Sequence, residues 1–321
     1  MTSPLILMYH RIAHAAIDPW RLAVSPAHFE EHLDILRRTR HPLPLTEFVR
    51  RLFDGALQPD AVAVTFDDGY VDNLTAGLPR LAAAGVPATV FLATGFIDRR
   101  EPFWWDEIAG LVLREDAPET FAVEIGGQRI TCALNTEFPE AESIDGSVRR
   151  STDRRAMLDS IYEPLRHLGD DERRATVAKL RAILSKDDIG ASLGRPMTGE
   201  EIRTLVADSL VAVGAHTVTH PSLPKLPSAA QCDELVRSKR LCESFVEAPV
   251  TAFAYPYGEY NAEVREAVKR AGFAIACTSL RGPAGAALDG LAMPRIFIPD
   301  QDGDAFERRI RWASALGEET G

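Results

Sequence analysis

Residues 61–70 read Ala-Val-Ala-Val-Thr-Phe-Asp-Asp-Gly-Tyr, an apolar run that ends in two adjacent carboxylates. Such a run is typical of an interior strand of a parallel sheet, which is buried on both faces. The carboxyl end of that strand is where α/β folds place their chemistry. Since successive side chains on a strand point to opposite sides, Asp67 and Asp68 can address one point only if the chain bends, which Gly69 permits. By itself, Asp-Asp-Gly is more typical of a solvated turn.

A second polar group follows another apolar segment, where residues 213–220 read Val-Gly-Ala-His-Thr-Val-Thr-His. If the chain turns helically there, the β-carbons of His216 and His220 lie about 5–6 Å apart, and both imidazoles can reach one divalent ion. Together with Asp68 they would form a site of two nitrogens and one oxygen with open positions, the pattern of a catalytic metal. Asp67 would then accept a proton from the attacking water. A solvated helix face is the alternative for the histidine pair alone.

A third group is the stretch Phe-Ala-Tyr-Pro-Tyr-Gly at residues 253–258. A Pro-aromatic-Gly turn at a strand end can direct a backbone N–H towards the site, where it would stabilise an oxyanion. An ordinary loop is the alternative for this stretch alone.

Strand-like and helix-like segments alternate along most of the chain. We expect strands at 5–9, 61–66, 88–92, 210–215, 250–255, 273–277 and 293–298. We expect helices at 26–38 (capped by Ser25), 72–84, 198–207 (opened by a capping box at Thr198), 228–246, 262–271 and 304–316. This order predicts a mostly parallel sheet with helices outside it, and about seven strands favour a deformed barrel over an open sheet.

Residues 98–197 have a different character and are predicted to be a mostly helical insertion within a single domain of residues 1–321. They include a possible hairpin around Gly126-Gly127 and a charged helix at 170–184. Because the insertion follows a strand, we expect it over the carboxyl-end face of the barrel. Trp104 and Trp105 are candidate substrate-binding residues that could stack on sugar rings, although adjacent tryptophans also serve as packing anchors.

Composition excludes several classes of function. A net charge of −11 argues against nucleic acid or an anionic membrane as a partner. No stretch approaches the roughly 20 apolar residues of a membrane span. No basic region precedes the first apolar run, and the four cysteines form no Cys-x-x-Cys pair, so we expect a cytoplasmic protein. An exported form whose leader has been removed would have the same sequence.

The three motifs together resemble those of the polysaccharide deacetylase family, carbohydrate esterase family 4, which has the NodB homology fold. The resemblance rests on Thr-Phe-Asp-Asp-Gly at 65–69, His-Thr-x-x-His at 216–220 and Pro-Tyr-Gly at 256–258, in this order and at strand ends. It covers residues 1–97 and about 198–300. It implies a deformed (β/α)7-type barrel and a metal-dependent hydrolase that removes acetyl groups, usually N-acetyl groups of amino sugars.

The resemblance also implies a role for each motif residue. Asp67 resembles the catalytic base, and the backbone N–H of Tyr257 resembles a donor to the oxyanion. The ligands of one divalent ion are resembled by Asp68, His216 and His220. We expect this ion to be zinc, with nickel or cobalt as alternatives. Tyr70 ends the first motif and is a candidate substrate contact.

The sequence departs from the family pattern in two places. An arginine that orients the base usually precedes the Pro-Tyr pair, but Ala254 stands there, and Arg295 is either its replacement or a surface arginine. The family also carries a late Leu-x-His whose histidine is the general acid, but no histidine follows His220. Met8-Tyr9-His10 has the required pattern, as in the permuted subgroup that includes biofilm poly-N-acetylglucosamine deacetylases. His10 is then the general acid; the alternative is a capping or core histidine.

Three functions remain open from the sequence. The leading one is removal of N-acetyl, or O-acetyl, groups from an amino-sugar-containing glycan or glycoconjugate, which would be the partner of this chain. The second is hydrolysis of a non-sugar C–N amide bond on the same fold. The third is carbohydrate binding without catalysis, which Ala254 favours and the complete set of base and metal-type residues disfavours.

Overall fold

The computed structural model describes residues 2–134, 148–151, 154–184, 193–284 and 289–315. The chain divides into two compact units. Unit 1 comprises Met1–His14, Arg21–Arg99 and Pro196–Gly321, and unit 2 comprises Ala15–Trp20 and Arg100–Arg195. Unit 2 therefore contains nearly all of the segment that the sequence marks as an insertion, together with a short piece from near the amino terminus.

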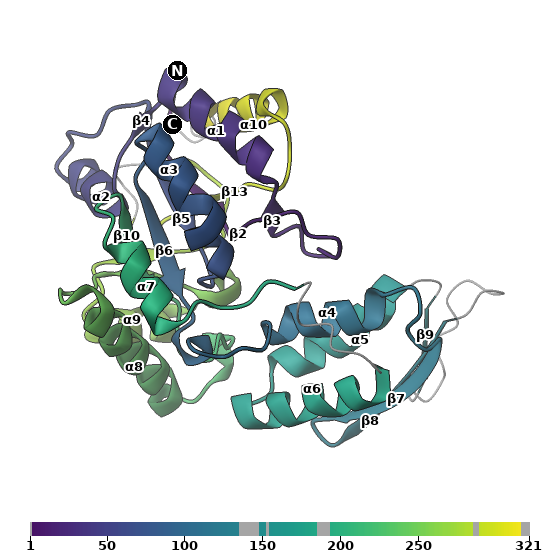
Figure 1. Cartoon of the computed structure of the whole chain (residues 1–321). Coiled ribbons are helices and arrows are strands. Elements are labelled where there is room, and N and C mark those ends of the chain that lie inside the picture. Colours follow the sequence, from purple (N-terminus) through teal and green to yellow (C-terminus); the bar gives the residue numbers. More distant parts are fainter. Residues whose placement is uncertain (1, 135–147, 152–153, 185–192, 285–288, 316–321) are drawn as a thin grey trace. The chain divides into compact units, whose positions relative to one another are not determined.

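Unit 1 is built on a parallel sheet (Figure 1). In spatial order its strands are β12 (Ile275–Cys277), β11 (Ala252–Ala254), β10 (Val211–Ala215), β6 (Ala88–Leu92), β5 (Ala61–Phe66), β1 (Leu5–Tyr9) and β13 (Ile296–Phe297), with β4 (His41–Pro42) paired to β5. An isolated parallel bridge between Cys277 and Met293 joins the two ends of this sheet. In that bridge the Met293 N–H donates to the carbonyl of Ala276 at 2.8 Å. The predicted deformed barrel is confirmed.

The described helices of unit 1 lie close to their predicted positions, except for one at Leu45–Phe53 that was not predicted. They are α1 (Pro26–Thr39), α2 (Leu45–Phe53), α3 (Leu78–Ala84), α7 (Gly199–Val206), α8 (Ser228–Val246), α9 (Ala262–Arg270) and α10 (Gly303–Ala315). Ser25 caps α1, and Thr198 forms the expected capping box with Glu201 at the start of α7. The helix predicted over 72–84 is present as a continuous helical segment over 71–84, which contains a π-helical turn, η1 (Asn73–Gly77), before α3. Pro79 lacks the N–H that a continuous α-helix would direct at the residue 75 carbonyl, so the regular ladder cannot run through this segment.

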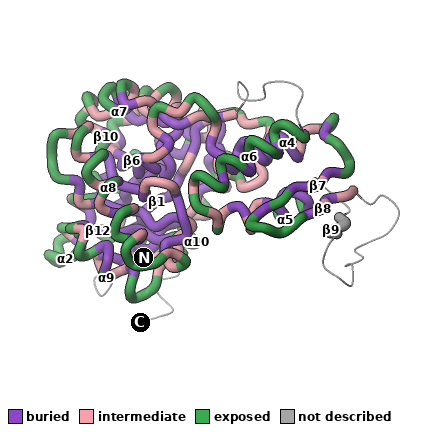
Figure 2. Tube along the Cα trace, turned by 90° about the horizontal axis from the view of Figure 1, so that it is seen from below, coloured by how far each residue is buried: buried purple, intermediate pink, exposed green. Residues whose placement is uncertain are grey.

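The central strands are buried along their whole length, as Figure 2 shows for β1 and β6. Alternate residues of β1 belong to two different apolar clusters. Leu5 and Leu7 pack in the cluster that includes residues of α1 and α10, whereas Ile6 packs with Ala61 and Phe91. A strand with apolar neighbours on both sides needs the continuous apolar run that marks it in the sequence.

Unit 2 consists of helices α4 (Trp104–Leu113), α5 (Arg154–Arg166) and α6 (Asp170–Leu184) and strands β7 (Thr120–Ile125), β8 (Gln128–Leu134) and β9 (Val148–Ser151). β7 and β8 form the predicted antiparallel hairpin, which turns at Gly126 and Gly127 with φ of 58° and 76°. The remaining short strands, β2 (Arg11–Ile12) and β3 (Ala23–Val24), pair with each other and belong to unit 1. Among the described residues, no helix has the length and apolar character needed to cross a membrane.

Candidate active site

The two adjacent carboxylates follow β5 directly, and the chain bends where they lie. Asp68 has φ of 72° and Gly69 has φ of 87°, so the left-handed turn begins one residue earlier than the glycine. A β-carbon at Gly69 would lie 2.7 Å from Leu92 Cδ2, so a side chain there would have to displace the Leu92 side chain as well as adopt a positive φ. The bend lets Asp67 and Asp68 serve different partners although they are neighbours in sequence.

Asp67 forms a buried two-point ion pair with Arg295, whose side chain is 1% exposed. Arg295 Nη1 donates to Asp67 Oδ1 and Nη2 donates to Oδ2, both at 2.7 Å. Nε donates to the Thr278 carbonyl at 2.9 Å, and Nη1 also donates to Thr65 Oγ1 at 3.1 Å. Burial alone would raise the pKa of Asp67, but the charge and hydrogen bonds of Arg295, together with the charges of His216 and His10, outweigh it and lower this pKa to about 2. Asp67 is therefore an ionised carboxylate held in one orientation, and Arg295 is not a surface residue.

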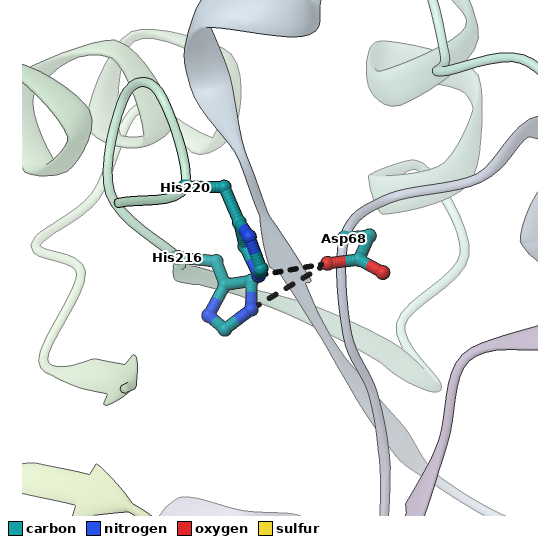
Figure 3. Close-up of side chains that lie close together, drawn as sticks. All are labelled: Asp68, His216 and His220. Carbon is teal, nitrogen blue, oxygen red and sulfur yellow. Dashed lines mark ion pairs between the residues drawn. The ribbon is translucent and has the colours of Figure 1, made fainter. Parts of the chain in front are cut away.

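His216 and His220 lie on a loop after β10, not on a helix. Thr217 and His220 have φ of 66° and 55°, so the helical turn considered from the sequence spacing is wrong for this segment. The loop nevertheless brings both imidazoles to Asp68, as Figure 3 shows. Each Nε2 lies 3.5 Å from Asp68 Oδ1. His216 Nδ1 lies 2.8 Å from the Ala254 carbonyl, and since a carbonyl only accepts, Nδ1 carries the proton and Nε2 offers its lone pair.

The cluster of Asp68, His216 and His220 fits a divalent ion. All three residues are buried, and their ligand atoms lie within 4.8 Å of one another. Two atoms that each lie about 2.1 Å from a shared tetrahedral ion are roughly 3.4 Å apart. The observed 3.5 Å separations between Asp68 Oδ1 and the two Nε2 atoms match that spacing. Two imidazoles and one carboxylate suit zinc, nickel or cobalt, so the donor set restricts the metal without identifying it.

His10 follows β1 and lies within electrostatic range of the same groups. Burial lowers the pKa of His10 to about 4, with Asp67 opposing this shift and the charges of Arg295 and His216 adding to it. Its Nδ1 atom is buried without a hydrogen-bond partner, and its ring contacts Phe297 at a centroid distance of 6.0 Å. The structure thus brings His10 to the carboxylate and histidine cluster from the first strand of the barrel.

Tyr257 lies in a short turn, η5 (Pro256–Gly258), with φ of 60°. Its ring packs edge-on against His220 at a centroid distance of 4.6 Å, and its hydroxyl donates to the His220 carbonyl at 3.4 Å. The role of its backbone N–H stays a prediction. Of the seven described non-glycine residues with positive φ, four lie in this site, namely Asp68, Thr217, His220 and Tyr257. Unfavourable backbone conformations commonly collect at functional sites, where the surrounding structure holds them.

Three candidate substrate contacts are buried instead. Tyr70 is 0% exposed and has the guanidinium of Arg11 4.8 Å from its ring centroid. Trp104 and Trp105 are each 5% exposed. Trp104 stacks on Tyr162 at 5.3 Å between centroids, inside unit 2. A ring with so little exposed surface cannot stack on a sugar, so we assign these three residues to packing.

One residue that contacts the site carries no signal in the sequence. Glu234, on α8, accepts hydrogen bonds from Val218 N–H and Thr219 N–H at 2.7 and 2.9 Å, on the loop between the two histidines. A glutamate within an otherwise ordinary charged helix carries no sequence signal for such a contact.

A buried cluster of metal-ligand type at the strand ends of a deformed parallel barrel, beside an oriented carboxylate, is typical of a hydrolase. Comparison with known proteins identifies the family. A sequence model described as polysaccharide deacetylase matches residues 54–117 and 170–276, which is more than half of the chain. This chain belongs to the polysaccharide deacetylase family.

Individual relatives agree with that assignment. The chain is 29% identical over 121 residues to the Bacillus subtilis (strain 168) protein named "Putative polysaccharide deacetylase YxkH", a match that spans 37% of this chain and 43% of that protein. The fold is similar to that of the Streptococcus pyogenes deacetylase PplD in complex with acetate, with a TM-score of 0.59, 18% identity and coverage of 96% and 98% of the two chains. IcaB from Ammonifex degensii gives a TM-score of 0.59 and 18% identity, with 98% of both chains covered. At these identities the structures establish the fold.

Proposed function

We propose that this protein is a metal-dependent hydrolase that removes N-acetyl groups, or O-acetyl groups, from an amino-sugar-containing glycan or glycoconjugate. The observation that carries the proposal is the pair of carboxylates after β5, of which Asp67 is oriented by Arg295 at 2.7 Å and Asp68 faces two histidines at 3.5 Å. Asp67 can thus accept a proton, and Asp68 can bind a metal. Family membership and the likeness to a deacetylase solved with acetate support the same reaction class.

Asp68, His216 and His220 would hold the ion, which we propose to be zinc. When bound, a divalent ion supplies Lewis-acid polarisation of the acetyl carbonyl and lowers the pKa of a water molecule towards roughly 7. Asp67 accepts the proton of the attacking water, and its Arg295 pair holds it in the orientation needed for that transfer. The Tyr257 N–H would donate to the developing oxyanion.

His10 gives a proton to the departing nitrogen, which leaves poorly as an anion. With a pKa lowered to about 4, His10 is neutral at pH 7 before the reaction begins. Protons nevertheless balance over the reaction, because the attacking water releases one and the amine takes one up. The proton that Asp67 accepts from the water therefore has to pass to His10 within the turnover, and the solvent need not supply one.

An acetate-release screen tests the proposal. The purified protein is incubated with N-acetylated glycans, nucleotide sugars and lipid-linked sugars, with and without a chelator. We expect acetate from at least one glycan, its loss with chelator and its return on adding zinc. Asp68→Ala should abolish both acetate release and stoichiometric zinc measured by elemental analysis, whereas His14→Ala, an exposed residue of unit 1, should change neither.

Two outcomes would contradict parts of this proposal. Acetate from none of these substrates, with hydrolysis of a non-sugar amide, would assign the protein to the amide-hydrolase alternative. Zinc bound at full stoichiometry after Asp68, His216 and His220 are all replaced by alanine would rule out this metal site.

A further inference from the structure

The loop that carries both histidines has an unfavourable backbone. It leaves β10 at Ala215 and contains two non-glycine residues with positive φ, Thr217 at 66° and His220 at 55°. L-residues rarely adopt this conformation, and it persists only when the surrounding contacts hold it. The positions of the two imidazoles therefore depend on what holds residues 217–219.

One side of the loop is held by the turn η2 (Thr94–Phe96), which follows β6. The Thr94 N–H donates to the Thr217 carbonyl at 3.0 Å, and the Gly95 N–H donates to the Val218 carbonyl at 2.7 Å. These two bonds satisfy carbonyl groups of the loop but leave its N–H groups to other partners.

The other side is held by a single side chain from α8. Glu234 Oε2 accepts from Val218 N–H at 2.7 Å and from Thr219 N–H at 2.9 Å, and Oε1 accepts from Thr219 Oγ1 at 2.7 Å. Hydrogen bonds to an ionised carboxylate are stronger than those between neutral groups. Glu234 thus binds the loop at three points between the two histidines, and it lies 14 residues beyond His220 in the sequence.

We propose that Glu234 is a positioning residue that holds the 217–219 loop in its left-handed conformation and so sets His216 and His220 for metal binding. This inference rests on the proposed function for its metal step, while the loop-holding step stands on hydrogen bonds alone. The three hydrogen bonds of Glu234 go to the residues between the histidines and not to the imidazole rings. Residues that orient ligands from outside the ligand set typically change metal affinity by 10- to 100-fold when replaced.

The test combines amide exchange with metal affinity. We expect Glu234→Ala to speed hydrogen–deuterium exchange at Val218 and Thr219 in the metal-free protein. We expect it also to weaken zinc binding, measured by competition with a chromogenic chelator, by roughly 10- to 100-fold. Glu234→Gln keeps a carbonyl for the two N–H groups and should lose less of both. The matched control is Asp233→Ala on the same helix, because Asp233 pairs with Arg237 in an exposed i,i+4 contact at 2.8 Å and its variant should behave as wild type.

Each result decides between the two steps. Zinc binding as tight in Glu234→Ala as in wild type, or unchanged exchange at Val218 and Thr219, would overturn the inference. If the wild-type protein binds no zinc while exchange still speeds up in Glu234→Ala, the loop-holding role stands and the proposed metal function falls. If Glu234→Ala fails to fold, Glu234→Leu, which also lacks an acceptor, gives the same two readouts, and wild-type values for both would overturn the inference.

Discussion

At the residue scale, the base of this site depends on one buried arginine from the far end of the chain. Arg295 lies 228 positions from Asp67 in the sequence and donates hydrogen bonds to both of its carboxylate oxygens. Ala254 is fully buried and belongs to the same apolar cluster as Ala63 and Phe91, so a guanidinium at this position would lie among apolar side chains. Because the planar guanidinium of Arg295 donates to both carboxylate oxygens, it holds Asp67 in one orientation and also favours its ionised form.

Replacing Arg295 should make Asp67 a poorer base at low pH. In Arg295→Met the largest lowering influence on the pKa of Asp67 is gone, so burial raises this pKa above its wild-type value against the charges of His216 and His10 alone. Because Asp67 acts when ionised, the acid limb of the kcat/KM profile should move to higher pH, and the protein should lose about 3–5 kcal/mol of stability from the unpaired buried charge. Arg295→Lys keeps the positive charge but loses the two-point contact of the guanidinium, so it should move the acid limb less. An unmoved acid limb in the Met variant would contradict the role of this pair.

His10→Ala should keep metal and fold but slow amide substrates by roughly 10²–10⁴-fold. The rate on an activated ester, whose leaving group needs no proton, should fall far less. Since burial lowers the pKa of His10 to about 4, the protonated form disappears as pH rises through 4, and no limb from an ordinary histidine near pH 6.5 is expected. Steady-state rates on matched amide and ester substrates check this. Equal losses on both would mean that His10 positions the site and does not donate a proton.

At the scale of elements, the site is assembled where strands end and turns begin. β5, β6, β10 and β11 each lead into a turn that supplies or holds a site residue, and several of these turns use left-handed backbone. The turn η2 after β6 supplies no ligand, yet its Gly95 is packed against the histidine loop. A β-carbon at Gly95 would lie 2.6 Å from the Val218 carbonyl oxygen.

Gly95→Ala should therefore displace the histidine loop and weaken zinc binding while the barrel stays folded. The clash is with backbone, which cannot swing aside as a flexible side chain would. Isothermal titration of zinc into the metal-free protein, with circular dichroism for the fold, measures the effect. Gly282→Ala is the matched control, because a β-carbon at that position would have no described atom within 4 Å. Equal zinc affinities in the two variants would show that the loop does not depend on this contact.

At the scale of the whole molecule, the two units have separate cores. Trp104 stacks on Tyr162, contacts Trp105 at a ring-centroid distance of 5.6 Å and has the Arg173 guanidinium 5.3 Å from its ring, all within unit 2. None of the proposed base, acid or metal-ligand residues belongs to this unit. Its contribution to substrate choice remains a prediction.

Trp104→Ala should destabilise unit 2 by about 3–5 kcal/mol, the usual loss for a buried aromatic side chain. Zinc content should stay unchanged, because every proposed ligand lies in unit 1. Limited proteolysis should cut the variant first within residues 100–195. Trp312→Ala on α10, where the side chain is 52% exposed, should cost little and serves as the control. Loss of zinc together with the unit 2 cleavage would show that the two units are energetically coupled.

A buried histidine outside the site should contribute to the loss of stability at acid pH. His32 is fully buried, stacks on Phe306 at 4.1 Å and accepts from the Tyr9 hydroxyl at 3.2 Å. Burial lowers the pKa of His32 to about 4, although its hydrogen bond to the Gln301 carbonyl opposes the shift. Between pH 6.5 and 4 the unfolded chain binds a proton at this residue that the folded protein does not, so stability falls as pH falls. The linked loss is about 3 kcal/mol.

His32→Gln should flatten this part of the pH dependence, since glutamine keeps hydrogen-bonding atoms but does not titrate. Urea unfolding at pH 8 and pH 5 measures the difference. Tyr9→Phe removes the hydroxyl but leaves the imidazole, so it should retain the wild-type slope. If His32→Gln loses as much stability between the two pH values as wild type, His32 is not the source of the acid sensitivity.

The sequence by itself determined the central strands and placed candidate site residues at their carboxyl ends. Segments 5–9, 61–66 and 88–92 were predicted to the residue, because a strand buried on both faces needs an unbroken apolar run. The motifs at 65–69 and 216–220 could be placed together because the carboxyl ends of neighbouring parallel strands share one edge.

Only the tertiary structure decided how those residues are held. The pairing of Arg295 with Asp67 depends on closure of the sheet that brings β13 beside β1, and no local pattern encodes a contact across 228 positions. The left-handed loop, its hold by Glu234 and the burial of Trp104 likewise depend on neighbours distant in sequence. The periodicity of apolar residues indicates which faces of a helix or strand are buried. It does not indicate which elements pack against each other, and these features depend on that packing.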